Sequence, residues 1–277
     1  MPSFLCHNKA LFAGGVVLLA LMICVAFAPQ IAPFDYDAMN YGERMQLPSS
    51  SHLFGTDFFG RDLFSRAIYG SRIACAVGVL SVLFAAVPGL ALGLLSGYRQ
   101  GWGDLVIMHA MDGLLAFPSL LLALAVITAL GPGHLQATVS IAIIFLPSFT
   151  RLVRGQVLAI RHEDYVQAAV ALGASDWGII TRHILPNIMG PLIVQVTVSF
   201  ANAILIEAGL SFLGLGTQPP LPSWGAMLQE AKNFMAQQPY AAILPGAAIA
   251  LTVMGGNLFG DGLRDWLDPR FRSRRHT

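Results

Sequence analysis

Few residues of this sequence have the types and spacing that covalent or metal chemistry requires. Neither of the two lysines completes a G-x-x-x-x-G-K-[ST] phosphate loop, because Lys9 is followed by alanine and Lys232 by asparagine. The seven histidines lack the H-E-x-x-H spacing of a zinc site, the three cysteines lack C-x-x-C spacing, and no serine lies in a G-x-S-x-G turn. The sequence therefore predicts no catalytic site, no metal site and no phosphate-loop ATP site in this chain.

Two carboxylates stand out instead, because they lie in long apolar segments where an ionised group is costly. Glu207, four residues before Ser211, could line a path across a membrane together with that serine. Its carboxylate could there meet a peptide amino group or a metal cation. The alternative is a helix-end carboxylate that is in water or paired with another chain. Asp112 presents the same two alternatives.

These carboxylates are carried by apolar stretches of membrane-spanning length. Of the 277 residues, 55% are hydrophobic and 11% are charged, whereas a globular domain carries about 25% charge. Six stretches come near the roughly 20 residues that a helix needs to cross a bilayer. They are 11–30, 73–95, 105–130, 135–153, 188–213 and 241–262. The prediction is an all-α, polytopic membrane protein with six transmembrane helices. The net charge of +1 argues against a nucleic-acid partner.

Prolines inside these stretches, such as Pro118, are expected to be tolerated, since neighbouring helices can satisfy the freed backbone groups. The first stretch could be a signal peptide, because Lys9 precedes it and Ala26-Phe27-Ala28 resembles a cleavage site. Its apolar run of about 18 residues exceeds the roughly 7–15 of a signal core. A retained anchor is therefore favoured.

The distribution of Lys and Arg predicts the orientation. With the N-terminus inside, the segments between the stretches hold 11 of these residues on the inner side and 5 on the outer side, which together make the 16 of the chain. Cytoplasmic loops carry the excess of positive charge. Both termini, and the loop between the fourth and fifth stretches, are therefore expected to face the cytoplasm.

That loop contains a polar block, YVQAAVALGASDWGIITRHILPN, at 165–187. Asp164 favours a helix start, Gly173 can end this helix in a left-handed conformation, and Asp176 or the serine before it can cap a second helix. Pro186 is expected to stop the second helix. The block either merely connects two spans or docks a soluble partner. Its small residues and its capping signals favour docking.

The block resembles the EAA loop of bacterial ABC-importer permeases. The match consists of Gln167-Ala168-Ala169, Gly173 and Ile184-Leu185-Pro186. In that family the loop forms a coupling helix that seats in a groove of an ATP-hydrolysing subunit. The resemblance implies this role for Asp164, Gln167, Ala168, Ala169, Gly173, Asp176, Ile184 and Pro186. Gln167 stands where the family has glutamate, so this position keeps hydrogen bonding and loses the charge.

Three further segments resemble the C-type subunit of the dipeptide, oligopeptide and nickel permease family. HLFGTDFFGRDLFSR at 52–66 is similar to LGTDxLGRDxxSR. EAGLSFLGLG from Glu207, with PP at 219–220 and WG at 224–225, is similar to SFLGLG…PP…WG. FGDGLRDWLDP at 259–269 is similar to GDxLRDxLDPR. Together these matches extend from residue 52 to residue 270 in the family's order.

The first of these segments supplies the candidate residues on the outer side. Gly-Thr-Asp and Gly-Arg-Asp are typical of turns in which an aspartate bonds nearby backbone groups. Arg61 or Arg66 could pair with Asp57 or Asp62 to hold the outer loop shut. The alternative is direct contact with a substrate-delivering protein.

The resemblance implies the fold of a type I ABC-importer permease, in which this chain is not an enzyme. Its expected parts are an anchor helix at 1–30, an extracytoplasmic loop at 31–72, a core of five transmembrane helices at 73–262 and a cytoplasmic tail at 263–277. The core would include the coupling loop at 154–187. The expected place is the bacterial inner membrane.

The implied partners are membrane lipid, a related permease subunit that completes a heterodimer, two ATP-binding subunits that use ATP and magnesium, and an extracytoplasmic binding protein. The implied cargo is a di- or oligopeptide. Nickel or a nickel chelate is the alternative within the class, and an ATP-independent channel or a membrane scaffold is the alternative from a different class.

Overall fold

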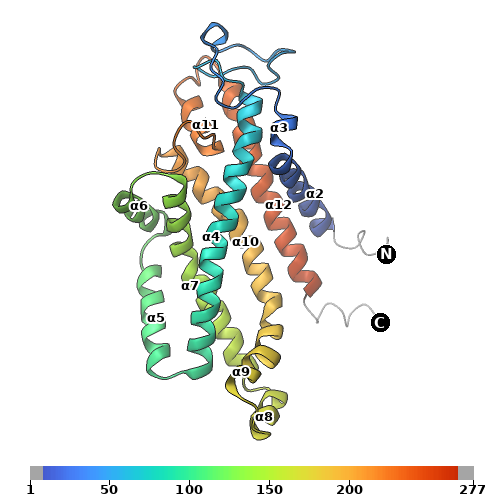
Figure 1. Ribbon diagram of the computed structural model, residues 1–277, viewed down its shortest axis with the longest axis vertical. Coiled ribbons are helices and arrows are strands. Elements are labelled where there is room, and N and C mark those ends of the chain that lie inside the picture. Colours follow the sequence, from blue (N-terminus) through green and yellow to red (C-terminus); the bar gives the residue numbers. More distant parts are fainter. Residues whose placement is uncertain (1–8, 268–277) are drawn as a thin grey trace.

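The computed structural model describes residues 9–267, and within this range the chain consists of helices and connecting loops without β-strands (Figure 1). The expectations for residues 1–8 and 268–277, at the ends of the anchor and the tail, lie outside the described residues. The helices are α2 (Lys9–Ala26), α3 (Ala28–Ile31), α4 (Leu63–Arg99), α5 (Trp102–Leu115), α6 (Ser119–Leu130), α7 (His134–Ile160), α8 (Asp164–Ala171), α9 (Asp176–Ile179), α10 (Leu185–Phe212), α11 (Trp224–Lys232) and α12 (Ile243–Leu267). Short 3₁₀ turns cover Tyr41–Glu43 and Pro239–Ala242, and a π-helical turn covers Ile180–Ile184.

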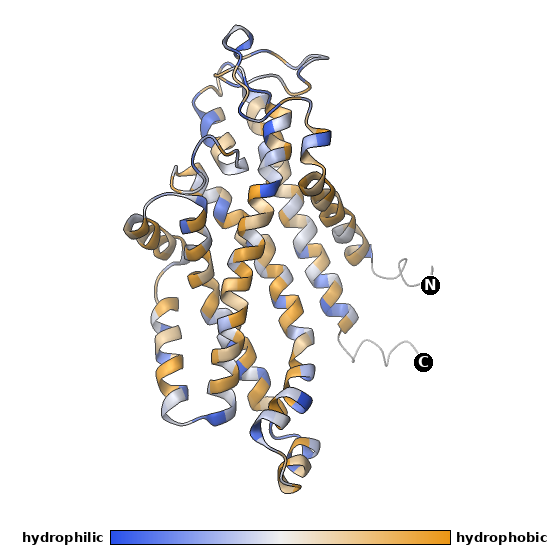
Figure 2. Ribbon diagram, in the orientation of Figure 1, coloured by the Kyte–Doolittle hydropathy of each residue, from blue (hydrophilic) through white to orange (hydrophobic). Residues whose placement is uncertain are grey.

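Five helical segments are long and apolar enough to cross a membrane. They are Lys9–Ala26, Leu63–Arg99, His134–Ile160, Asp176–Phe212 and Pro239–Leu267. The bent pair of α5 and α6 makes a sixth if it is taken as one span. Hydrophobic residues occupy the middle of the bundle, and hydrophilic residues gather at its two ends (Figure 2). This is the pattern expected of a helix bundle whose apolar middle lies in the hydrocarbon core of a membrane.

The third expected span is not one helix. α5 ends at Leu115, α6 begins at Ser119 directly after Pro118, and the two are bent by 93°. Proline has no N–H to donate and disfavours helical geometry in the residue before it. The expectation that Pro118 would be tolerated inside a helix was therefore wrong.

The second span begins earlier than expected. Asp62 caps α4, because its side chain accepts a hydrogen bond of 2.7 Å from the backbone N–H of Ser65. The loop expected at 31–72 therefore ends at Asp62, and Arg66 lies in the first turn of α4 rather than in a loop. At about 1.5 Å per residue the 37 residues of α4 extend about 55 Å.

α4 packs tightly against α7 through a row of glycines. Gly89, Gly93 and Gly97 recur every fourth residue, and a Cβ atom added at each would lie 2.6–2.8 Å from a Cβ atom of α7. Small residues at this spacing let two membrane helices approach closely. Hydrophobic residues of α4, α7 and α10 form the largest buried cluster, which includes Phe149 and Val153.

The N-terminal helix α2 lies on α12 through a second glycine contact. A Cβ atom added at Gly14 would lie 2.5 Å from the carbonyl oxygen of Gly255. The end of α2 is tied to α4, because the Arg72 Nε atom donates to the Val25 carbonyl at 2.8 Å. A basic side chain at this place complements the negative end of the α2 dipole.

Candidate functional site

The polar block forms two short helices with a corner at Gly173. α8 begins at Asp164, and Gly173 follows its last turn with a φ angle of +81°. The hydroxyl of Ser175 then caps α9 by accepting from the N–H of Gly178 at 3.2 Å. The expected helix–corner–helix shape and the left-handed glycine are thus confirmed.

Pro186 does not stop the second helix. The chain continues from α9 through the π-helical turn at Ile180–Ile184 into α10, where Pro186 occupies the first turn. A proline ring would clash with the carbonyl four residues earlier in a regular α-helix, and the wider π turn before it removes that geometry. The polar block is therefore continuous with a candidate membrane span, which sequence reasoning missed.

Gln167 holds the start of the block against the helix before it. Its Nε2 atom donates a hydrogen bond of 2.7 Å to the carbonyl oxygen of Arg161, the C-cap residue that follows α7. A carboxylate has no proton to donate at this place. The glutamine at this position thus makes a contact that an ionised glutamate could not make, since its amide donates to a carbonyl at a helix end.

Three buried apolar side chains pack the block against the rest of the protein. Val166, Ile179 and Ile184 are each at most 1% exposed and belong to the large hydrophobic cluster. The α-helical spacing of Trp177, Ile180 and Ile184 in the sequence predicts one apolar stripe here, but the Trp177 side chain is 74% exposed. Sequence periodicity placed the stripe without regard to the π turn, which shifts the buried positions.

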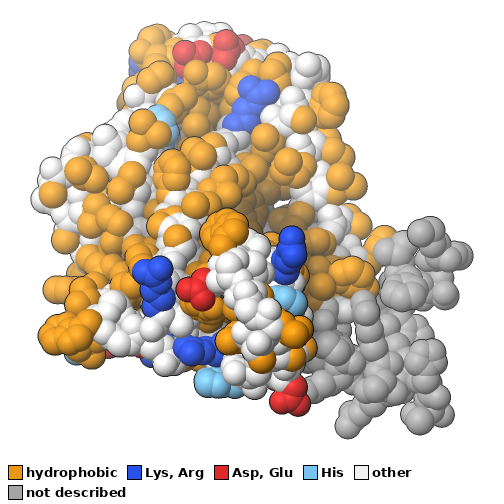
Figure 3. All heavy atoms as spheres, turned by 60° about the horizontal axis from the view of Figure 1, so that its bottom comes forward, with side chains coloured by type: hydrophobic (Ala, Val, Ile, Leu, Met, Phe, Trp, Pro, Cys, Tyr) orange, Lys and Arg blue, Asp and Glu red, His pale blue; other side chains and the backbone are white. Residues whose placement is uncertain are grey.

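The tip of the block is open to its surroundings. Leu172 is 89% exposed, and Gln167, Ala168 and Gly173 are also exposed, while Ala169 is half-buried. Figure 3 shows the block projecting from its end of the molecule, with hydrophobic side chains on it and Lys and Arg side chains around it. A projecting apolar surface of this kind is typical of a docking site for another protein.

Two hydrogen bonds join the block to the membrane spans. The Tyr98 hydroxyl, near the end of α4, donates to Asp176 Oδ1 at 2.8 Å. Asn187 Nδ2, in the first turn of α10, donates to the Tyr165 hydroxyl at 3.2 Å. The block therefore contacts both α4 and α10.

The opposite end of the molecule carries a buried cluster of four charges, Asp57, Arg61, Arg66 and Glu230. Arg61 Nε lies 2.6 Å from Asp57 Oδ2, and Arg61 Nη2 lies 3.0 Å from Glu230 Oε2. Arg66 Nη2 lies 3.3 Å from Glu230 Oε1, and Arg66 Nε lies 3.7 Å from Asp57 Oδ2. The expected pairing of Arg61 with Asp57 is confirmed. Glu230 was not predicted, because it lies on α11, far away in the sequence.

Asp62 lies outside this cluster and instead contacts a histidine and caps a helix. Its Oδ1 atom lies 2.9 Å from His52 Nδ1, and its Oδ2 atom accepts from the Ser65 backbone and hydroxyl at 2.7 Å each. The expected pairing of Asp62 with an arginine is therefore replaced by a histidine contact and a helix cap. Together with the four-charge cluster, these bonds attach the outer loop to α4 and α11.

Glu207 is buried among hydroxyl groups near the C-terminal end of α10. It is 1% exposed, and its Oε1 atom accepts from the Ser211 hydroxyl at 2.7 Å and from the Thr217 hydroxyl at 3.1 Å. Ser211 also accepts from the Thr217 N–H at 3.0 Å. These bonds pin the loop after α10 onto the helix. In the isolated chain the carboxylate faces the protein interior, and its place on a transport path stays a prediction.

Asp112 is exposed on α5 and forms an ion pair of 2.5 Å with Arg151 of α7. A second pair on the same two helices, missed in the sequence, joins Arg154 to both carboxylate oxygens of Asp104 at 2.7 Å. Both pairs fasten α5 to α7. Among residues 9–267, no three His, Cys, Asp or Glu side chains come together in a way that could hold a metal ion.

Comparison with known protein families gives two matches. Residues 89–273 match a model described as the binding-protein-dependent transport system inner membrane component. Residues 4–48 match a model described as the N-terminal transmembrane domain of oligopeptide transport permease C.

Individual relatives match over nearly the whole chain. A dipeptide transport system permease protein of Alkalihalophilus pseudofirmus is 44% identical over 96% of this chain and 88% of the relative. A glutathione transport system permease protein of Pectobacterium atrosepticum is 47% identical over 98% of this chain and 90% of the relative. A probable D,D-dipeptide transport system permease protein of Escherichia coli is 45% identical over 92% and 86%.

Proposed function

Because the chain belongs to the family of binding-protein-dependent transport system inner membrane components, we propose that it is one permease subunit of an ATP-driven importer for short peptides. The observation that carries this proposal is the projecting block of α8 and α9. It is exposed at its tip, yet bonded to α4 through Tyr98 and continuous with α10. A subunit without a phosphate loop needs such a place to receive force from an ATPase.

The proposed cargo is supported by the similar proteins. The relatives described above are permease proteins for dipeptides, D,D-dipeptides and glutathione, which are all small peptides with a free amino group. This favours a peptide over the nickel alternative. The ATP-independent channel and the scaffold are disfavoured by the family itself, which is defined by dependence on a binding protein.

The proposed assembly contains this chain, a related permease subunit, two ATP-binding subunits and an extracytoplasmic binding protein. ATP and magnesium would be bound by the ATPase subunits, and this chain would carry out no covalent chemistry. With the block on the cytoplasmic side, closure of the ATPases would displace α8 and α9. Their bonds to α4 and α10 would convert that displacement into a tilt of the spans, which alternates access to the path between the two permease subunits.

A substitution at the corner of the block tests this proposal. Gly173→Leu introduces a side chain at a φ of +81° with no atom within 4 Å of the new Cβ, so it adds bulk to an exposed surface and only about 1–2 kcal/mol of backbone strain. We expect the variant to reach the membrane in normal amounts, to lose copurification of the ATPase subunits and to lose peptide uptake.

Gly101→Leu is the matched control. Gly101 lies in the turn between α4 and α5, also has a positive φ of +72°, and also has no atom within 4 Å of an added Cβ. Both variants add the same bulk at a positive φ on different surfaces, and the ψ of −146° at Gly101 makes the control the more strained of the two. Normal ATPase binding by Gly173→Leu, or equal loss by both variants, would refute docking at the block.

A further inference from the structure

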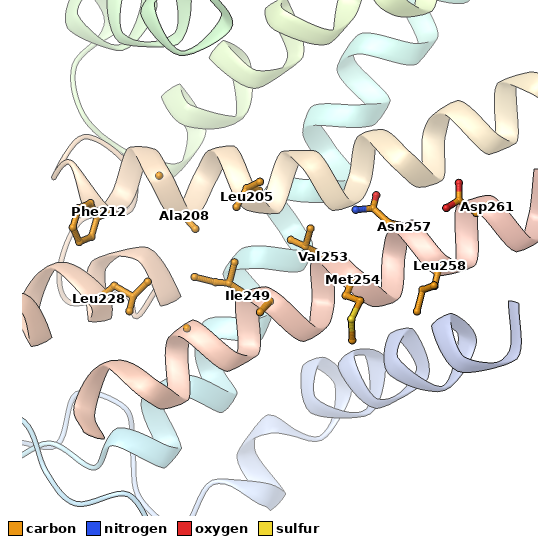
Figure 4. A pocket seen from close by; sticks show the side chains of 13 residues that line it. Leu205, Ala208, Phe212, Leu228, Ile249, Val253, Met254, Asn257, Leu258 and Asp261 are labelled. Atoms are coloured by element: carbon orange, nitrogen blue, oxygen red, sulfur yellow. The ribbon is translucent and has the colours of Figure 1, made fainter. Parts of the chain in front are cut away.

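A long groove runs between α10 and α12 and is bounded at one end by Leu228 of α11. It has a volume of about 710 Å³ and is lined mainly by apolar side chains. Its outer end is marked by Phe212 and Leu228, and its inner end by Asn257 and Asp261 (Figure 4). From Gly246 to Asp261 it follows α12 for about 22 Å, at about 1.5 Å per residue. The groove therefore crosses most of a hydrocarbon core of about 30 Å.

The inner end of this groove is polar. Asn257 and Asp261 are one helical turn apart, and Figure 4 shows both side chains pointing from α12 toward α10. Both residues lie within the candidate span Pro239–Leu267, where a carboxylate or an amide facing lipid is costly and such groups tend to face a cavity or a protein interior. The groove is therefore a poor surface for lipid chains alone.

Asp261 differs from three other carboxylates of the candidate spans, whereas Asp265 on the same helix is likewise exposed but does not line the groove. Asp104 and Asp112 are paired with arginines, and Glu207 is enclosed by hydroxyls. Within residues 9–267, no hydrogen bond or ion pair is found for Asp261, which is exposed in the groove. It is thus a carboxylate of a candidate span that is available to a ligand.

The volume and the chemistry of the groove identify the class of ligand. About 710 Å³ lies within the roughly 300–1,000 Å³ of small-molecule sites. Apolar walls that include Met254 adapt to different side chains. The common positive group of the small peptides transported by the relatives is the α-ammonium, which a carboxylate binds through charge-assisted hydrogen bonds.

We propose that the groove between α10 and α12 is this subunit's wall of the peptide path, and that Asp261, supported by Asn257, binds the α-ammonium group of the passing peptide. The inference rests on the proposed peptide-importer function and adds the residue that recognises the cargo. By the positive-inside rule Asp261 lies at the cytoplasmic end, so the ammonium is held there last before release.

The test uses the complete importer in proteoliposomes with ATP on the cytoplasmic side and alanyl-phenylalanine as the probe. Asp261→Asn removes the charge and keeps the shape, so we expect uptake at saturating loaded binding protein to fall about tenfold, which corresponds to about 1.4 kcal/mol. Asp261→Glu should retain most of the rate. Asp265→Asn is the matched control, since Asp265 lies one turn further along α12, is exposed and does not line the groove.

A second measurement reports on the groove itself. In a chain with its native cysteines replaced by serine, Asn257→Cys should react with a charged maleimide added from the cytoplasmic side. Alanyl-phenylalanine should slow this reaction during turnover, and its N-acetylated form should not. Wild-type uptake by Asp261→Asn would overturn the inference, as would an introduced thiol that never reacts because lipid or a partner helix fills the groove. Absence of uptake by the wild-type importer would instead overturn the proposed function.

Discussion

Neutralising Glu230 should destabilise the outer end of the protein, because it unbalances the buried four-charge cluster. Asp57, Arg61, Arg66 and Glu230 sum to zero charge, and the guanidinium of Arg66 is only 2% exposed. Glu230→Gln leaves one carboxylate for two buried guanidinium groups. Removal of one partner from a buried pair costs about 3–5 kcal/mol. Since the Glu230 side chain is itself 32% exposed, water relieves part of the imbalance, and we expect about 3 kcal/mol.

The assay is thermal unfolding of the purified chain in detergent, followed by the loss of monodisperse protein on size exclusion. At about 2.1 cal/mol/K of unfolding entropy per residue, the 277 residues give about 0.6 kcal/mol/K, so a cost of about 3 kcal/mol should lower the midpoint by about 5 °C. The control is Asp37→Asn, which removes an exposed carboxylate from the same outer loop and should leave the midpoint unchanged.

A second substitution separates charge balance from simple loss of contacts. Arg66→Met in the Glu230→Gln background leaves one buried arginine with one buried aspartate, Arg61 with Asp57 at 2.6 Å. We expect the double variant to recover part of the lost stability, since an uncompensated buried charge has been removed. A double variant less stable than Glu230→Gln alone would refute the charge-balance reasoning, as would a single variant as stable as the wild type.

Two further predictions concern helix contacts. Gly93→Leu places a Cβ atom 2.6 Å from Val153 Cβ, so α4 and α7 must separate and the free energy of unfolding should fall by at least about 1–3 kcal/mol. Gly113→Leu is the control and should leave the thermal midpoint unchanged, because no atom lies within 4 Å of its added Cβ; equal midpoints of the two variants would contradict the packing of α4 on α7. Gln167→Glu removes the hydrogen bond to the Arg161 carbonyl, which contributes about 1 kcal/mol, so amide hydrogen exchange at residues 161–167 should become about fivefold faster. Unchanged exchange would show that this hydrogen bond does not stabilise the start of the block.

Much of the fold follows from local features that a sequence displays directly. Apolar stretches of sufficient length located the candidate membrane spans, and Gly173 and Ser175 located the corner and the helix cap of the polar block. The errors lie where two local rules compete. Pro118 ends a helix inside an apolar stretch, and Pro186 does not, because a π turn precedes it.

The candidate sites were less predictable, since they depend on which segments the fold brings together. Glu230 meets Arg66 across 164 positions of sequence, and no local pattern marks that pair. Glu207 looked like a path residue from its depth alone, but the serine and threonine hydroxyls around it come from its own helix and from a returning loop. Asp261 was read only as part of a terminal motif, and its exposure in a groove appears only in three dimensions.

The continuity of α4 has a mechanical consequence. It is one helix of about 55 Å through Pro88, braced beside that proline by the contact of Gly89 with α7. Its inner end is bonded to Asp176 of the coupling block, and its outer end carries Arg66 in the four-charge cluster. α4 thus connects the polar block at one end of the molecule to the four-charge cluster at the other end. A rotation of about 5° about one end would carry the other through about 5 Å, so displacements of the polar block and of the four-charge cluster are linked through a single helix.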